Sequence, residues 1–267
     1  MQNKVVVITG ASSGIGKALA EVYASKGFDL VLAARRIDRL KELEAKLSNV
    51  KVLSVQTDVS IESDCKNLIE SAIQKFGKID ILINNAGISM RAATIDVEMN
   101  VLRKVMDVNL WGTIYCTKFA LPHLLASKGS LVGIISVGGY VGLPARSGYS
   151  ASKFAMRGFL DSVRVEHRRS GLHVLVAAPG FTTSDIRKSA LMADGRQQGA
   201  TPRDENKMMS AERCAHRIYM AVKRRQRKLI LKFIDGKATV LIAKLWADLV
   251  DGFIYRTFAK EPDSPLK

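Results

Sequence analysis

The sequence predicts an α/β fold, with a doubly wound, mostly parallel sheet of seven strands and a C-terminal helical extension. Short runs rich in β-branched residues alternate with longer stretches of helical periodicity, which is typical of βα units around a sheet buried on both faces. At 267 residues and 47% hydrophobic content, the chain is long enough for one such core. We therefore expect a single domain over residues 1–267.

Seven runs are the expected strands. They cover residues 4–9, 29–34, 51–56, 79–83, 130–136, 173–178 and 228–233. Between the first two runs, apolar residues recur at helical spacing, and Gly27 stands where that helix should end. The strand–helix–strand rhythm continues to the seventh run.

Two segments depart from this rhythm. Residues 184–210 are polar and have no clear period, so we expect a mobile loop or a short helical insertion there that acts as a substrate lid. Residues 236–267 carry Ile242, Trp246, Leu249 and Phe253 at i, i+4, i+7 and i+11. This spacing predicts one or two amphipathic helices that pack against the body or another subunit.

Charge and composition narrow the class of protein. The net charge of +16 attracts polyanions, phosphate-bearing cofactors or anionic lipid, and a polyanion-binding protein is one alternative. No zinc-finger, heptad or aromatic RNA-binding pattern accompanies the charge, so nucleic-acid binding is not expected. Because Asp248 and Asp251 would be repelled by anionic lipid, we do not favour peripheral membrane contact by the C-terminal stretch.

Cysteines, histidines and hydropathy add further expectations. Three dispersed cysteines and four dispersed histidines match no metal-ligand spacing, which predicts reduced thiols and no metal site. No apolar run has the length of a membrane span, and residues 5–8 are too short for a signal peptide. We expect a cytoplasmic protein.

A glycine-rich turn, TGASSGIG, follows the first predicted strand at residues 9–16. Glycines at such a turn allow a sharp bend, a close approach of backbone amides to a pyrophosphate, and tight packing of helix on strand. The turn therefore predicts a Rossmann-type dinucleotide site. Its expected cofactor-binding residues are Gly10, Ser12, Ser13, Gly14, Ile15 and Gly16.

Arg35 and Arg36 follow the second predicted strand, about where an NAD-specific site places an acid for the ribose hydroxyls. Arginine is suited instead to a 2′-phosphate. The sequence thus predicts NADP rather than NAD as the cofactor.

Tyr149 and Lys153 are four residues apart, which places both side chains on one face of a helix. A tyrosine with its ordinary pKa of about 10 is a poor base at neutral pH, and a nearby ammonium lowers that pKa. Ser136 closes the fifth predicted strand, and its hydroxyl is placed to hold a substrate carbonyl oxygen. The three residues predict proton transfer to or from a carbonyl or alcohol oxygen.

Taken together, the motifs over residues 4–234 resemble those of the short-chain dehydrogenase/reductase family. They are TGASSGIG at 9–16, Asp58-Val59, NNAG at 84–87, Asn109, Ser136, YSASK at 149–153 and Pro179-Gly180. A weaker match, over residues 251–262, resembles the tails of family members grouped with hydroxysteroid and retinoid dehydrogenases.

The resemblance implies a role for each matching residue. Tyr149 would be the general acid/base, Lys153 would bind the nicotinamide ribose and lower the pKa of Tyr149, and Ser136 would orient the carbonyl. Asn109 would hold a water that links Lys153 to solvent. Further cofactor contacts are implied for Asp58, Val59, Asn85, Ala86, Gly87, Pro179, Gly180 and Thr183.

The sequence thus predicts an NADP(H)-dependent oxidoreductase that interconverts a carbonyl and an alcohol by hydride transfer. Apolar residues near the predicted site, Val141, Leu143 and Phe181 among them, favour a moderately apolar small-molecule substrate. The resemblance also implies a homodimer or homotetramer. The alternative is a catalytically silent NADP-binding regulatory or scaffold protein, since a fold alone never guarantees chemistry.

Overall fold

The computed structural model describes residues 3–201, 204–205, 208–231, 233–243 and 245–266. A seven-stranded sheet runs through it in the order β3-β2-β1-β4-β5-β6-β7, and every strand pair is parallel. The strands are β1 (Val5–Thr9), β2 (Asp29–Ala34), β3 (Val52–Gln56), β4 (Ile81–Asn84), β5 (Ser130–Ile134), β6 (His173–Ala178) and β7 (Lys228–Ile230). The predicted doubly wound sheet is confirmed.

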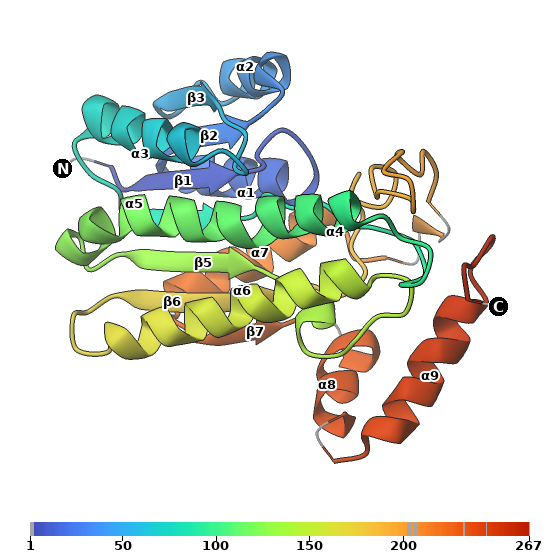
Figure 1. Ribbon diagram of the computed structural model, residues 1–267. Coiled ribbons are helices and arrows are strands. Elements are labelled where there is room, and N and C mark those ends of the chain that lie inside the picture. Colours follow the sequence, from blue (N-terminus) through green and yellow to red (C-terminus); the bar gives the residue numbers. More distant parts are fainter. Residues whose placement is uncertain (1–2, 202–203, 206–207, 232, 244, 267) are drawn as a thin grey trace.

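Helices cover both faces of the sheet, as Figure 1 shows. On one face lie α1 (Gly14–Ala24), α2 (Ile37–Lys46) and α7 (Ala211–Lys223), and on the other lie α3 (Glu62–Phe76), α5 (Gly112–Ala126) and α6 (Ser147–Glu166). The fully buried strands β1, β2 and β4 explain the continuous apolar runs in the sequence. A shorter helix, α4 (Met99–Met106), continues through the π-helical η1 (Asp107–Trp111) into α5.

The chain reverses its direction of winding between β1 and β4. From β1 it builds outward through β2 and β3, and then it returns to place β4 on the other side of β1. In open α/β sheets, ligands bind at the carboxyl ends of the strands at such a switch point. The loops after β1 and β4 are therefore where the fold places a site.

Two predicted strands end earlier than expected. The run 130–136 ends as a strand at Ile134, because Ser136 caps the short 3₁₀ helix η2 (Val137–Gly139). The run 228–233 ends at Ile230, residue 232 lies outside the described residues, and Phe233 opens the π-helical η4 (Phe233–Ala238). The strand β7 pairs with β6, and β6 stops at Ala178 because Pro179, which follows, has no amide for the ladder.

The predicted lid segment, residues 184–210, holds no α-helix in its described part. An isolated bridge between Leu191 and Met90 holds it beside the loop after β4, and a second bridge, between Leu191 and Gln197, lies within the segment. Residues 202, 203, 206 and 207 of this segment lie outside the described residues. Its role as a lid stays a prediction.

The C-terminal extension contains α8 (Thr239–Ile242) and α9 (Ala247–Ala259), which stand beyond the edge of the sheet (Figure 1). Three residues of the predicted apolar stripe, Trp246, Leu249 and Phe253, are 63%, 67% and 55% exposed, whereas the fourth, Ile242, packs against the apolar cluster between the extension and the body. The buried face of α9 consists instead of Val250, Ile254 and Phe258. The expected spacing spans the break between the two helices, where Trp246 has a non-helical φ of −139°, so the helical phase is lost there.

The hydroxyl of Tyr23 is buried in the core between α1 and α7 and finds no hydrogen-bond partner among the described residues. Its ring makes edge contacts with Phe28 and Tyr219 that a phenylalanine would keep. Because an unpaired buried hydroxyl costs free energy, we expect Tyr23→Phe to raise the free energy of unfolding by about 1 kcal/mol. Urea denaturation measures the change.

Tyr219→Phe is the matched control, since the side chain of Tyr219 is only partly buried and its change should stay within about 0.5 kcal/mol of zero. A loss of stability on Tyr23→Phe would mean that the hydroxyl is satisfied after all, for instance by a buried water.

Candidate active site

The turn between β1 and α1 has a shape that only glycine permits at three positions. Gly10 and Gly14 have φ values of +66° and +53°, in the left-handed region. A Cβ placed on Gly16 would lie 2.2 Å from the carbonyl oxygen of Gly10. The N-terminal residue of α1 is flanked by Ser13, which makes no capping hydrogen bond within the described chain, so the first helical amides remain available to an anion. The turn fits a pyrophosphate.

Asn85 ties this turn to the loop after β4. Its side-chain amide donates to the carbonyl oxygens of Thr9 and Gly10, at 2.9 and 3.3 Å. In return, the hydroxyl of Thr9 accepts hydrogen bonds from the backbone amides of Asn85 and Ala86, both at 3.0 Å. These bonds hold together the two loops at the switch point of the sheet.

A cavity of about 500 Å³ opens at this edge of the sheet. Most residues predicted for the site line it: Gly10, Ser12, Ser13, Gly14, Ile15, Arg35, Arg36, Asp58, Val59, Asn85, Ala86, Gly87, Ser136, Tyr149, Lys153, Pro179 and Gly180. Gly16, Asn109 and Thr183 stand outside this lining. Gly16 packs α1 against the turn, which is one of the tasks that glycine has in such a motif.

Arg36 lies against the glycine turn. Its Nη2 donates to the hydroxyls of Ser12 and Ser13, at 3.0 and 3.2 Å. Arg35 lines the same end of the cavity and is exposed. Two guanidinium groups therefore face the end of the cavity that the turn defines.

Ser136, Tyr149 and Lys153 meet at the centre of the cavity. Tyr149 is on the first turn of α6, only 9% exposed, and its hydroxyl shares a hydrogen bond with the side chain of Ser136. Burial raises the pKa of Tyr149, and the hydrogen bond with Ser136 and the charges of Arg146 and Arg187 offset part of that rise. At neutral pH the phenol is therefore protonated and ready to donate.

Lys153 lies one turn further along α6 and is 3% exposed. Its Nζ donates to the carbonyl oxygen of Ile134 at 3.0 Å and lies 5.9 Å from the centre of the Tyr149 ring. Burial lowers the pKa of Lys153 from 10.5 to about 7. In this structure Ser136 and the two arginines, rather than Lys153, are the described groups that lower the pKa of Tyr149.

Asn109 is fully buried in the π-helical η1. Its side chain donates to the carbonyl oxygen of Ile88 and to the hydroxyl of Ser152, at 3.0 and 2.9 Å, and accepts from the amide of Ile88 at 2.8 Å. Gly87 packs between it and Lys153, since a Cβ on Gly87 would lie 3.1 Å from Oδ1 of Asn109 and 3.4 Å from Nζ of Lys153. Asn109 thus fixes the loop that passes over Lys153; the water that the resemblance implies stays a prediction.

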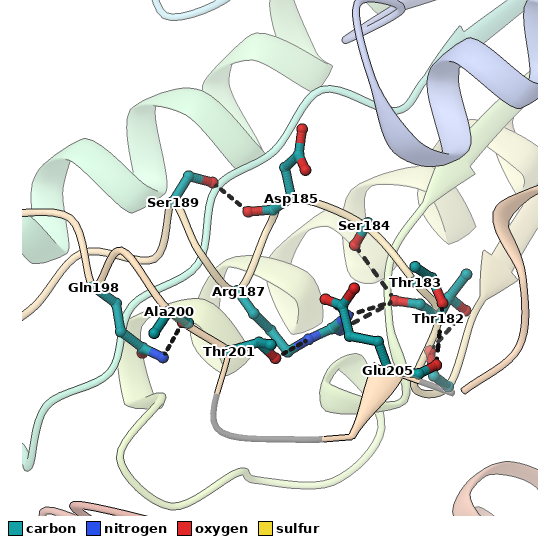
Figure 2. Close-up of polar contacts among 11 residues, drawn as sticks. Thr182, Thr183, Ser184, Asp185, Arg187, Ser189, Gln198, Ala200, Thr201 and Glu205 are labelled. Carbon is teal, nitrogen blue, oxygen red and sulfur yellow. Dashed lines mark hydrogen bonds and ion pairs between the residues drawn. The ribbon is translucent and has the colours of Figure 1, made fainter. Parts of the chain in front are cut away.

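The segment after β6 forms the opposite wall, and Figure 2 shows its polar contacts. Arg187 reaches back from it to the carbonyl oxygen of Thr182, at 3.1 Å, and to Glu205, at 3.4 Å. Thr182 and Ser184 line the cavity, whereas the hydroxyl of Thr183 points to the carbonyl oxygen of Glu205, at 3.5 Å.

Sequence reasoning missed the residues that complete the substrate end of the cavity. These are Arg146, Arg187, Phe253, Ile254, Thr257 and Phe258. Arg146 stands three residues before Tyr149, a spacing that in a helix would have marked it as a neighbour, but it precedes the first helical residue, Ser147. Nothing in the sequence brings the α9 residues to Tyr149.

An α/β sheet with a glycine turn and a buried Ser–Tyr–Lys group at its switch point defines a dinucleotide-binding protein of the oxidoreductase class. The family model described as short chain dehydrogenase matches residues 4–194. The chain belongs to the short-chain dehydrogenase/reductase family.

Curated relatives agree with this assignment. Mouse "Dehydrogenase/reductase SDR family member 7B" is 33% identical over 97% of this chain and 81% of its own length. The Arabidopsis thaliana protein "11-beta-hydroxysteroid dehydrogenase-like 2" is 44% identical over 68% of this chain and 60% of its own length.

Solved structures share the fold. An alcohol dehydrogenase from Thermococcus sibiricus, complexed with 5-hydroxy-NADP, has a TM-score of 0.79 and 24% identity over 88% of this chain and 99% of that one. A short chain dehydrogenase/reductase from Burkholderia phymatum, in complex with NAD, has a TM-score of 0.77 and 26% identity over 85% and 88%.

The burial of Lys153 predicts a pH-dependent cost in stability. Between pH 7 and 10.5 the unfolded chain holds the lysine proton and the folded one does not, so stability rises with pH across that window, and the full penalty applies below pH 7. Removing the buried ammonium should raise the free energy of unfolding at pH 6 by roughly 2–4 kcal/mol. The hydrogen bond that Lys153→Met also loses should reduce this gain by about 1 kcal/mol. The gain should shrink steadily towards pH 10.

Urea denaturation at several pH values measures this gain. Lys118→Met, which changes an exposed lysine on α5, should show no pH-dependent gain. A gain for Lys153→Met that does not vary with pH would contradict a buried ammonium as its cause.

Proposed function

We propose that the protein is an NADP(H)-dependent oxidoreductase that interconverts a carbonyl compound and an alcohol. The observation that carries this proposal is the meeting of Ser136, Tyr149 and Lys153 in the cavity that the glycine turn also lines. A nucleotide-binding end and a proton-transfer group thereby share one space. That combination is what a hydride-transfer enzyme needs.

The nicotinamide cofactor supplies or accepts the hydride at the carbonyl carbon. Ser136 holds the carbonyl oxygen through its hydroxyl, and Tyr149 donates its phenolic proton to that oxygen in reduction or removes it in oxidation. The phenol is protonated at neutral pH, which is the form that donates in reduction, and Ser136, Arg146 and Arg187 offset part of the rise in its pKa that burial causes. Lys153, whose Nζ is 5.9 Å from the centre of the Tyr149 ring, would hold the ribose hydroxyls and, when protonated, would stabilise the phenolate that forms on proton transfer.

Arg35 and Arg36 support NADP as the cofactor. Both line the cavity at the glycine turn, and Arg36 already donates to Ser12 and Ser13, groups that border a phosphate position. An acid for the ribose hydroxyls is replaced here by two cations. The solved relatives include one complex with 5-hydroxy-NADP and one with NAD, so the choice depends on these arginines.

The substrate end of the cavity supports a bulky, largely apolar substrate. Its walls come from Val141, Leu143, Phe181, Phe253, Ile254 and Phe258. Apolar walls with polar groups such as Ser136, Tyr149 and Arg146 among them are the usual composition of a small-molecule site. The name of the Arabidopsis relative, which contains hydroxysteroid dehydrogenase, agrees with a substrate of this size and polarity.

Tyr149→Phe tests the proton-transfer role. We expect turnover to fall by about 10²- to 10⁴-fold, because general acid–base catalysis contributes on that order, while NADPH binding changes little. The assay is nicotinamide absorbance with a panel of ketones, aldehydes and secondary alcohols and both cofactors. Tyr140→Phe is the matched control, since the ring of Tyr140 is held between Arg157 and Lys228 and its hydroxyl has no role in the proposed step.

Full turnover of a folded, NADPH-binding Tyr149→Phe protein would overturn this assignment. A wild-type protein that binds NADPH tightly and turns over no compound of the panel would favour the regulatory alternative.

Arg35→Asp tests the cofactor preference. An aspartate repels a 2′-phosphate and accepts hydrogen bonds from ribose hydroxyls, so NADPH affinity should fall at least tenfold while NADH affinity rises. Titrations of nicotinamide fluorescence with both cofactors measure the two affinities. Arg169→Asp, an equal charge change at an exposed position after α6, should leave their ratio unchanged. Tighter binding of NADH than NADPH by the wild type would contradict the preference.

A further inference from the structure

The C-terminal tail reaches back to the cavity through one buried carboxylate. The side chain of Glu261, two residues after α9, is 4% exposed. Its Oε2 lies 3.0 Å from Nη2 of Arg146 and 3.6 Å from Nε of Arg91. The guanidinium of Arg91 also donates to the carbonyl oxygen of Pro262.

These two arginines are brought together by the backbone. Arg91 precedes Ala92 and Arg146 follows Ala145, and the amide of Ala92 donates to the carbonyl oxygen of Ala145 at 3.0 Å. This backbone bond brings the two arginines close together. The amide of Arg91 donates to the carbonyl oxygen of Leu191, at 2.7 Å, which links the same loop to the segment after β6. Glu261 therefore joins the tail to the loop after β4, to the start of α6 and, through that loop, to residues 184–210.

Arg146 makes this junction part of the substrate cavity. It lines the cavity, lowers the pKa of Tyr149, and places its guanidinium 4.6 Å from the centre of the Phe258 ring. Phe258 lines the cavity as well, together with Phe253, Ile254 and Thr257 of α9. The position of α9, and with it this wall, depends on contacts at the end of the chain.

The apolar contacts of α9 do not fix its position by themselves. Val250, Ile254 and Phe258 pack on Val137, Val141 and Val240, and such aliphatic packing tolerates small shifts. The carboxylate of Glu261 is more restrictive, because it accepts a directional hydrogen bond from Arg146 and lies in ion-pair range of Arg91. If the tail moved away, Arg91, which is 6% exposed, and Arg146 would both lose the carboxylate of Glu261.

We propose that Glu261 is a positioning residue for the substrate site, and that its pairing with Arg146 and Arg91 holds α9 in place as a wall of the cavity. This deepens the proposed function and rests on it only for the kinetic part of the test. The substrates that should depend on this wall are large apolar ketones, since small ones reach Ser136 and Tyr149 without contacting α9.

Glu261→Gln is the test, because it keeps the shape of the side chain and removes its charge. With acetophenone, benzophenone and a four-ring steroid ketone as probes, KM should rise tenfold or more for the largest probe and less than threefold for acetophenone. The kcat values and NADPH affinity should change less than threefold, because the catalytic and cofactor groups are untouched. Asp263→Asn, an equal charge change at an exposed tail residue, should behave as wild type; Glu261→Asp should restore part of the loss.

Trypsin cleavage after Arg256 and Lys260, followed by mass spectrometry, tests the placement of α9 without any turnover. We expect it to be about tenfold faster in Glu261→Gln than in wild type or Asp263→Asn. This readout separates failure of the tail pairing from failure of the proposed function, since it needs neither substrate nor cofactor.

Should Glu261→Gln not fold, Arg91→Met tests the pairing from its other end while Arg146 still neutralises Glu261. Arg91→Met should raise the KM of the largest probe and increase the rate of trypsin cleavage, each by a smaller factor than Glu261→Gln. Wild-type cleavage rates in the folded variant would overturn the proposal, as would a KM increase equal for all three probes.

Discussion

The hydrogen bonds between Asn85 and the end of β1 are the contacts on which the site depends. At the switch point of the sheet, adjacent loops leave in opposite directions, and the fold by itself does not hold them together. The side-chain amide of Asn85 donates to the carbonyl oxygens of Thr9 and Gly10, where the chain leaves β1 and bends. The turn, the first amides of α1 and the loop over Lys153 thereby share one rigid frame.

Burying the charged group of this site costs free energy. A lysine ammonium held almost without exposure opposes folding, and the core on either side of the sheet has to offset it. The same burial makes the groups useful. It brings the pKa of Lys153 to about 7, so small changes in local charge alter the protonation of that lysine, while the phenol of Tyr149 stays protonated at neutral pH.

Much of this arrangement can be predicted from the sequence, for reasons that are local. The glycine turn, the buried strand runs and the i, i+4 pair of Tyr149 and Lys153 each depend on neighbours in the chain, and the regular crossover of parallel strands then fixes where they meet. The face of α9 cannot be predicted in this way, because the break before Ala247 resets the helical phase. Arg146 escaped prediction because its approach to Tyr149 follows from the left-handed Ala145, with a φ of +58°, and from a backbone bond to Ala92.

The cavity draws its walls from Gly10 near one end of the chain and from Phe258 near the other. Because synthesis runs from the N-terminus, the glycine turn after β1 is made long before α9, which forms the far wall of the cavity. Contacts between such distant residues form slowly and late in folding. Partly synthesised or C-terminally clipped chains would retain the nucleotide end of the cavity without its far wall, so cofactor occupancy in a cell would not by itself report the amount of competent enzyme.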